Sequence, residues 1–144
     1  MSDQYAVVGY VESSIPPGNA LKLGKQGEED MWVAIAKTEW GTIPGKADKD
    51  GTCWYFYFWK EYRTSQEFAY VTSIRPTKLV KSDSPPPLAV LSGYQTGGSG
   101  YLYAAVAETD WGTIPGKAKG DTCWYPYGNT EHKTKNFSWV VLDE

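Results

Sequence analysis

The sequence predicts an all-β protein built from two similar antiparallel halves. Three observations lead to this fold class. A string of ten residues recurs with nine identities, aromatic residues make up 15% of the chain, and 15 Gly and 9 Pro separate short apolar segments. Aromatic and β-branched residues favour strands, whereas Gly and Pro favour turns. With 144 residues, the chain is long enough to bury a core without help from a metal or a disulfide.

The internal repeat is the strongest of these signals. Residues 38–47 read TEWGTIPGKA and residues 109–118 read TDWGTIPGKA, so nine of the ten positions are identical. The likeness continues in both directions; TCWYFY in the first half, for example, parallels TCWYPY in the second. We therefore divide the chain into repeat 1 (1–74) and repeat 2 (75–144), with the junction near the proline-rich string SDSPPP.

Each repeat is expected to contribute short strands separated by turns. In repeat 1 the expected strands are Ala6–Val11, Met31–Lys37, Cys53–Trp59 and Phe68–Ile74. The segment WVAIA has some helical propensity, but it is short and has no helix cap before it, so we assign it to a strand. Three or four strands bury little apolar surface alone. The repeats should therefore pack against each other, or exchange strands, about a pseudo-two-fold axis.

Small insertions and deletions between the repeats mark the expected loops. They lie at 27–31, 48–51 and 66–67, all rich in charged residues, Gly or Gln. The string GGSG (97–100) lacks the Lys-Ser/Thr of a phosphate-binding loop and is expected to be a hairpin tip.

Charge and hydropathy exclude two classes of partner. The net charge is -3, from 14 basic and 17 acidic residues, and no basic run suits nucleic acid. No segment approaches the ~20 apolar residues of a membrane-spanning helix. Asp3, Gly9 and Glu12 interrupt the pattern of a secretory leader. We expect a cytoplasmic protein, or one secreted without a signal peptide.

The two cysteines occupy equivalent positions in the repeats. Cys53 and Cys123 lie in apolar T-C-W-Y strings, so buried free thiols are expected. They would form a disulfide only if they faced each other across the pseudo-axis.

The duplicated W-G-T-I-P-G-K string is the first candidate binding element. Pro followed by Gly fits a type II turn, which would present Lys46 and Lys117 to solvent opposite Trp40 and Trp111. Turn formation alone requires the Pro-Gly pair but not the same Lys and Trp in both copies. The simpler alternative is a solvated turn lysine beside a core tryptophan.

Acidic residues follow the aromatic strand in both repeats. Glu61 and Glu131 hold equivalent places there. A lysine and a carboxylate on neighbouring loops supply donors and acceptors, and an aromatic wall accommodates the apolar face of a sugar. This pattern suits a polyhydroxyl ligand. The alternative is a surface Lys–Glu pair of little energetic consequence.

The residues needed for catalysis or for a resident metal are sparse. His132 has no counterpart in repeat 1, which excludes a duplicated His metal site and a catalytic triad in each half. The segment DKDGT (48–52) lacks the terminal Glu of a calcium loop. Glu39 and Glu61 are carboxylates that a glycosidase could use, but nothing in the sequence pairs them. We expect no enzyme activity, no cofactor and no metal.

Several strings together resemble the DM9 repeat family of lectins, whose repeats also occur beside the pore-forming module of natterin-like proteins. They are P-P-G near the start, L-Y-A/W-V-A before a loop, I/L-P-G-K, C-W/Y-x-P-Y-G-x-x-E-H, and a closing F/Y-x-W/V-V-L. The resemblance covers nearly the whole chain. Repeat 2 matches better, because FYFWKEY in repeat 1 replaces the P-Y-G-x-x-E-H string.

The resemblance implies a mannose-recognising β-sandwich lectin that needs no calcium, has one site per repeat and can form a homodimer. In the family, the Lys of P-G-K and an Asp of a Gly-rich loop bind sugar hydroxyls. The lysine carries over onto Lys46 and Lys117, whereas Gln26 and Gln95 stand at the position of the family aspartate. In repeat 1 only, a nearby acid (Glu28, Glu29 or Asp30) could replace that aspartate. The candidate sugar-binding residues are Lys46, Lys117, Gln26, Gln95, Glu39, Asp110, Trp40, Trp111, Glu61 and Glu131.

Three functional hypotheses follow from these observations. The first is a calcium-independent lectin for mannose or mannose-containing glycans. The second is a structural or protein-interaction module without sugar binding, acting in innate immunity or development. The third is an enzyme such as a glycosidase or a protease. The paired Lys and Trp positions favour the first, because a purely structural module does not need them.

Overall fold

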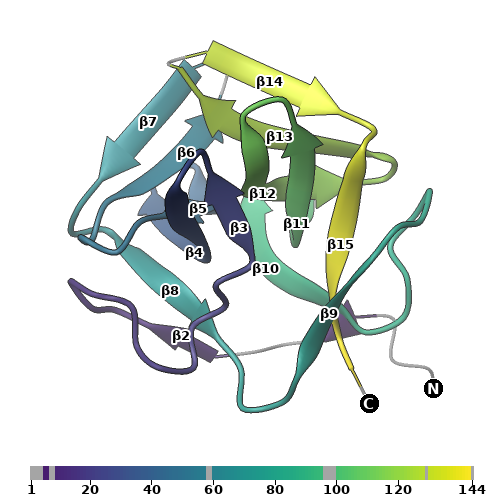
Figure 1. The fold of residues 1–144 in the computed structure, drawn as a ribbon, viewed down its shortest axis with the longest axis horizontal. Coiled ribbons are helices and arrows are strands. Elements are labelled where there is room, and N and C mark those ends of the chain that lie inside the picture. Colours follow the sequence, from purple (N-terminus) through teal and green to yellow (C-terminus); the bar gives the residue numbers. More distant parts are fainter. Residues whose placement is uncertain (1–4, 7–8, 58–59, 96–99, 129, 144) are drawn as a thin grey trace.

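The computed structural model describes residues 5–6, 9–57, 60–95, 100–128 and 130–143, and the side chains of 5, 6, 130 and 131 lie outside this description. The described residues form β-strands and no helix, which confirms the all-β fold class (Figure 1). The described part of the chain thus has no helix of the length and apolar character that crossing a membrane requires.

Of the fifteen strands of the described residues, eight lie in repeat 1 and seven in repeat 2. Repeat 1 holds β1 (Tyr5–Ala6), β2 (Gly9–Val11), β3 (Gly24–Gln26), β4 (Glu29–Thr38), β5 (Gly41–Ala47), β6 (Cys53–Tyr57), β7 (Lys60–Thr64) and β8 (Phe68–Thr72). Repeat 2 holds β9 (Thr77–Val80), β10 (Ala89–Gln95), β11 (Gly100–Thr109), β12 (Gly112–Lys119), β13 (Thr122–Tyr127), β14 (Thr130–Thr134) and β15 (Phe137–Leu142).

The two halves exchange strands about a pseudo-two-fold axis. β3 of repeat 1 pairs with β12 of repeat 2, and β10 of repeat 2 pairs with β5 of repeat 1. The long hairpins also correspond, because β4–β5 and β11–β12 have the same register displaced by 71 residues. The pairing is antiparallel apart from the short parallel contact of β1 with β10. Of the two predicted arrangements, strand exchange is the one observed.

The short hairpins lie together at one end of the molecule. Figure 1 shows β6–β7 and β13–β14 beside each other at the top, whereas β2 and β9 lie toward the opposite end. Each short hairpin follows the strand that carries the repeated I-P-G-K string. This arrangement brings the aromatic hairpin of one half close to the repeated strand of the other.

The strands predicted from composition agree with the structure. Met31–Lys37 lies within β4, which rules out the helical alternative for WVAIA. Phe68–Ile74 ends as a strand at Thr72, and Cys53–Trp59 is a strand to Tyr57, its last two residues lying outside the description. The first predicted strand appears as β1 and β2, with residues 7–8 also outside it.

The predicted loops agree only in part. Residues 48–51 and 66–67 lie outside the strands, whereas 29–31 belong to β4. The predicted GGSG hairpin tip falls on residues 97–99, outside the described residues, and on Gly100, where β11 begins.

The predicted type II turn at I-P-G-K is wrong, because the string forms the middle of a strand in both repeats. One edge of β5 pairs with β4 along its whole length, and the opposite edge changes partners within the string. It pairs with β10 at Gly41 and Thr42 and with β6 at Lys46 and Ala47, so Pro44 falls in the gap between them. A proline lacks the N–H of a ladder bond and is tolerated where none is needed.

The glycine of I-P-G-K serves close packing rather than a turn. A side chain at Gly45 would collide with the carbonyl oxygen of Trp54 on β6, and Gly116 stands against Trp124 in the same way. The exchanged strands make a matching contact. A side chain at Gly93 would meet the ring of Pro44, and one at Gly24 would meet Pro115.

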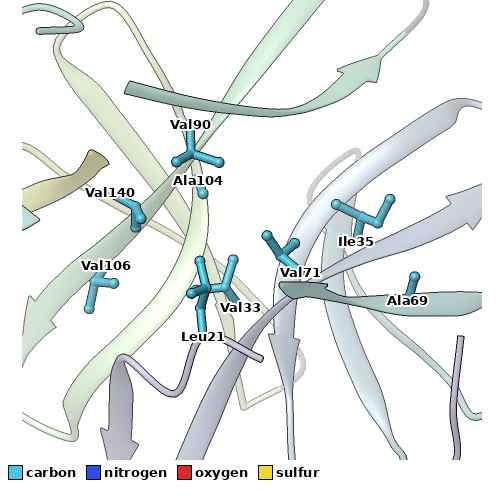
Figure 2. Packing of buried hydrophobic residues seen from close by; sticks show 9 residues of the cluster. All are labelled: Leu21, Val33, Ile35, Ala69, Val71, Val90, Ala104, Val106 and Val140. Carbon is cyan, nitrogen blue, oxygen red and sulfur yellow. The ribbon is translucent and has the colours of Figure 1, made fainter. Parts of the chain in front are cut away.

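The central core lies between the two halves. It contains Leu21, Val33, Ile35, Ala69 and Val71 from repeat 1 and Val90, Ala104, Val106 and Val140 from repeat 2 (Figure 2). The alternate residues of the long strands face a second core within each half. Ala34 and Ala36 of β4, for example, pack with Ile43 and Phe68. Burial on both faces explains why the β4 segment is apolar almost throughout.

Candidate functional site

The lysines of the repeated string are buried, contrary to the predicted outward orientation. Lys46 is only 3% exposed and Lys117 only 5%. The reason is the alternation of side chains along β5. Ile43 and Ala47 pack in the core of repeat 1, so Lys46 and Pro44 face the opposite side, toward repeat 2. The lysines therefore point into the boundary between the halves and not into solvent.

Lys46 lies among groups from both repeats. Its Nζ donates a hydrogen bond to Oε1 of Gln26 across 2.5 Å. The same Nζ lies 5.7 Å from the ring centroid of Trp54 and 5.4 Å from that of Tyr127, a residue of repeat 2. Both distances are within the range in which an ammonium group is attracted to an aromatic face.

The charge of Lys46 is destabilised by its surroundings. Burial away from water lowers the pKa of its ammonium from 10.5 to about 8, and the nearby carboxylate of Glu61 opposes part of this decrease. The lysine is therefore mostly protonated at neutral pH, in a place where an additional acceptor would stabilise it.

Lys46 opens onto a cavity of about 220 Å³. Its walls are formed by Gln26, Glu29, Met31, Lys46, Trp54, Glu61 and Gly128. Gly128 belongs to the turn after β13, so the cavity receives backbone from repeat 2. One ammonium, one amide and two carboxylates thus meet beside an indole ring in a space smaller than the ~300–1,000 Å³ of sites for drug-sized ligands.

Lys117 has a related environment with one more hydrogen bond to protein. Its Nζ donates to Oε1 of Gln95 at 2.7 Å and to the carbonyl oxygen of Phe56 at 2.8 Å. It also lies 5.2 Å from the ring of Phe56 and 6.0 Å from that of Tyr57. Both aromatic residues come from repeat 1. The predicted equivalence of the two lysines holds in position, but their hydrogen bonding differs.

The repeated tryptophans support the aromatic residues around the lysines. Trp111 stacks on Tyr127 with ring centroids 4.3 Å apart, and Tyr127 covers Lys46. Trp40 stacks on Tyr57 at 4.2 Å, and Tyr57 lies beside Lys117. Each tryptophan therefore packs against a tyrosine that contacts the lysine of the other repeat.

The predicted acidic residues separate into two groups. Glu61 lines the Lys46 cavity, together with Glu29, one of the three acids proposed to replace the family aspartate. Glu39 and Asp110 are exposed in the β4–β5 and β11–β12 turns. Glu39 lies at the far end of its hairpin from Lys46, about 17 Å away at ~3.4 Å per residue. The side chain of Glu131 lies outside the described residues.

Other candidates from the sequence have structural roles. Cys53 and Cys123 are buried free thiols, and burial raises the pKa of both. Oδ1 of Asp48 in DKDGT accepts hydrogen bonds from the backbone of Asp50 and Thr52, which closes a turn. The ring of His132 stacks on Tyr125 at 5.2 Å. Within the described ranges, no three His, Cys, Asp or Glu residues gather as a metal site.

Sequence reasoning did not identify Tyr127, Tyr57 and Phe56 as neighbours of the lysines. The parallel between TCWYFY and TCWYPY contains these residues, but only strand exchange shows that each set faces the lysine of the other repeat.

Fold and site together define an all-β protein with two strand-exchanged halves, each with a buried lysine that donates a hydrogen bond to a partly buried glutamine. No family model matches the sequence, and no curated protein matches it. The fold is similar to the crystal structure of the nematode sperm cell motility protein MFP2B. The TM-score is 0.65 at 14% sequence identity, and the match covers 94% of this chain and 46% of that one. At this identity the likeness shows the fold alone.

Proposed function

We propose that this protein is a member of the DM9 repeat family and a calcium-independent lectin for mannose or mannose-containing glycans. The observation that carries the proposal is the hydrogen bonding of Lys46. An ammonium group has three N–H donors, and in the described part of the chain Lys46 gives one of them, to Gln26. Two donors of a buried, cavity-lining lysine therefore remain for a ligand.

The other walls of the Lys46 cavity complement a sugar ring. Glu29 and Glu61 supply acceptors, Gln26 supplies an amide, and Trp54 supplies an apolar surface. Adjacent hydroxyl groups of a hexose require donors and acceptors together, and hydrogen bonds to charged partners are the stronger ones. The second site, at Lys117 and Gln95, should be weaker because Lys117 already donates to two protein oxygens.

A structural or protein-interaction module is the second candidate function. Each lysine contacts aromatic residues of the opposite repeat, so the pairs also hold the halves together. The two candidates differ in one consequence, which is that only the lectin binds free sugar.

A glycan array, run with and without a chelator, tests the proposal. We expect mannose-terminated glycans to be retained in both conditions. Calorimetry with mannose should then show that Lys46→Met removes the tighter site. Lys49→Met, at an exposed lysine in the neighbouring turn, is the matched control and should bind as the parent does. No retention of any glycan would overturn the lectin and favour the interaction module.

Two further proposals concern the setting of the protein. Buried free thiols are typical of a reducing compartment, which supports a cytoplasmic location. The family resemblance also supports a homodimer, in which four sites would increase avidity for clustered glycans.

A further inference from the structure

A second cavity lies on the side of repeat 1 that faces the exchanged strand β10. It has a volume of about 530 Å³, within the range typical of small-molecule sites. Its lining residues come from β2, β4, β5, β8, β10 and β11 and from Glu12, which follows β2, and none of them lines the Lys46 cavity. The residues that matter for its chemistry are Tyr10, Ile35, Ala69, Leu91, Ser92, Tyr94 and Tyr101.

Three tyrosines form the outer walls of this cavity. Tyr10, Tyr94 and Tyr101 are 41%, 47% and 63% exposed, although aromatic rings are usually more buried. The rings of Tyr94 and Tyr101 meet edge to face at 5.1 Å. The Tyr10 hydroxyl donates to the carbonyl oxygen of Leu91 at 3.2 Å, which fixes that ring at the cavity.

The inner wall is apolar and contains one unsatisfied polar group. Ile35 and Ala69 line it, and Figure 2 shows them at one end of the central core, away from Val106. Ser92 is 1% exposed, and its Oγ has no hydrogen-bond partner. Among the described residues it is the one buried side-chain oxygen or nitrogen in this condition. A buried hydroxyl without a partner is destabilising, so its position beside a cavity suggests a ligand group that completes it.

The other half shows that the fold does not require this cavity. Ser92 precedes Gly93, which packs against Pro44, and Leu23 precedes Gly24, which packs against Pro115 in the same way. Leu23 packs onto the central core, where repeat 2 has the serine hydroxyl instead. Lys25 likewise corresponds to Tyr94, since the two occupy the same place in the exchanged pairs. Repeat 1 therefore supplies an apolar side chain where repeat 2 has a polar group and an aromatic wall.

We propose that this cavity binds a small phenolic molecule, with its ring among the three tyrosines and its hydroxyl bonded to Ser92. An aromatic ring packs well among tyrosines at edge-to-face geometry. One hydroxyl matches Oγ of Ser92, the one buried side-chain polar atom among the described residues that has no partner. Ile35, Ala69 and Leu91 form the apolar part of the lining. Glu12, Lys37 and Thr42 also line the cavity, but Glu12 and Lys37 form an ion pair with each other and Oγ1 of Thr42 accepts a hydrogen bond from the backbone of Tyr94. The site is therefore distinct in place and chemistry from the proposed lectin site.

Titration of the ¹⁵N-labelled protein with p-cresol, followed by NMR, tests this inference. Toluene is the matched probe because it has the same ring and methyl group but no hydroxyl. We expect saturable shifts centred on Ser92, Tyr94 and Tyr101, and an affinity for p-cresol about tenfold above that for toluene, the factor expected of one hydrogen bond. Ser92→Ala should make the two affinities equal.

Two further variants separate the site from general effects on folding. Ser92→Leu introduces the side chain of Leu23 and should abolish p-cresol binding, while mannose binding stays as in the parent. Tyr101→Ala removes an exposed wall with little effect on folding and should weaken binding severalfold. Leu79→Ala, on an exposed residue of β9, is its control. Equal affinity for both probes in the parent, or p-cresol shifts that persist in Ser92→Leu, would overturn the proposal.

Discussion

Replacement of Lys46 by methionine should change the dependence of stability on pH. Methionine is an unbranched side chain only one atom shorter than lysine and carries no charge, so the cost of burying an ammonium is lost together with the hydrogen bond to Gln26. The hydrogen-bond loss is independent of pH, whereas the charge term depends on it. The pH profile therefore isolates the charge.

The magnitude follows from the pKa of Lys46. This pKa is about 8 in the folded protein, against 10.5 without burial. Between these values the unfolded chain holds a proton that the folded protein has released, so the parent gains stability as pH rises. At 1.36 kcal/mol per pKa unit, the cost of the buried charge is about 3 kcal/mol below pH 8. It should fall by about 2.5 kcal/mol between pH 7 and pH 10.

Urea unfolding of the parent and Lys46→Met between pH 7 and pH 10 measures this change. The difference between the two proteins is the quantity to use. Burial raises the pKa of Cys53, Cys123 and Tyr70, so their ionisation in the unfolded chain lowers stability at alkaline pH in both proteins alike. Subtraction removes that common contribution.

We expect the free energy of unfolding of Lys46→Met minus that of the parent to decrease by about 2.5 kcal/mol from pH 7 to pH 10. Lys49→Met, which removes an exposed ammonium, should show no such trend. A flat difference for Lys46→Met would refute the reasoning, because it would mean that Lys46 keeps an ordinary pKa in the folded protein.

Three further predictions concern packing, aromatic support and metal. Gly45→Ala should lower the free energy of unfolding by about 2 kcal/mol or more in urea denaturation, because its new methyl group meets backbone of β6. Gly18→Ala, in open space, should change it by less than about 1 kcal/mol. Trp111→Ala should weaken sugar binding at Lys46 severalfold in calorimetry, because Trp111 supports the tyrosine that covers this lysine; unchanged affinity would exclude that role. Prior dialysis against EDTA should leave mannose affinity unchanged, whereas a loss restored by calcium would contradict the proposed mode of binding.

The strands could be predicted from sequence because their composition and their burial agree. The runs of aromatic and β-branched residues in β4 and β8 are buried on both faces of the sheet. Their continuous apolar character is typical of buried strands. The duplication indicated the pseudo-symmetry as well. Strand exchange remained one of two alternatives, because a residue pattern does not say which copy completes which sheet.

The I-P-G-K string was misassigned because local preference and tertiary context disagree. Pro-Gly favours a turn in isolation, but Pro44 fits a strand whose edge changes partners from β10 to β6 at that point. The error extended to Lys46, because a turn presents its lysine to solvent. With the strand assigned correctly, the alternation of Ile43 and Ala47 with Lys46 places the lysine between the halves.

The family resemblance named Lys46, Lys117, Gln26 and Gln95 only as sugar-binding candidates, and the structure adds that Lys46 donates to Gln26 and Lys117 to Gln95. Glu39 illustrates the opposite case. It is close to the repeated string in sequence, yet a hairpin directs it away from Lys46. Proximity along a strand is a poor guide to a site, because each further residue moves the chain by more than 3 Å.

The most direct test of the lectin account is a crystal structure of the protein with mannose. The account predicts one hexose in the Lys46 cavity, with ring hydroxyls within hydrogen-bond distance of Lys46 Nζ and of the Glu61 carboxylate, and with an apolar face against Trp54. A mannose bound elsewhere, or a Lys46 cavity that stays free of sugar at saturating mannose, would contradict the assignment of this lysine to sugar recognition.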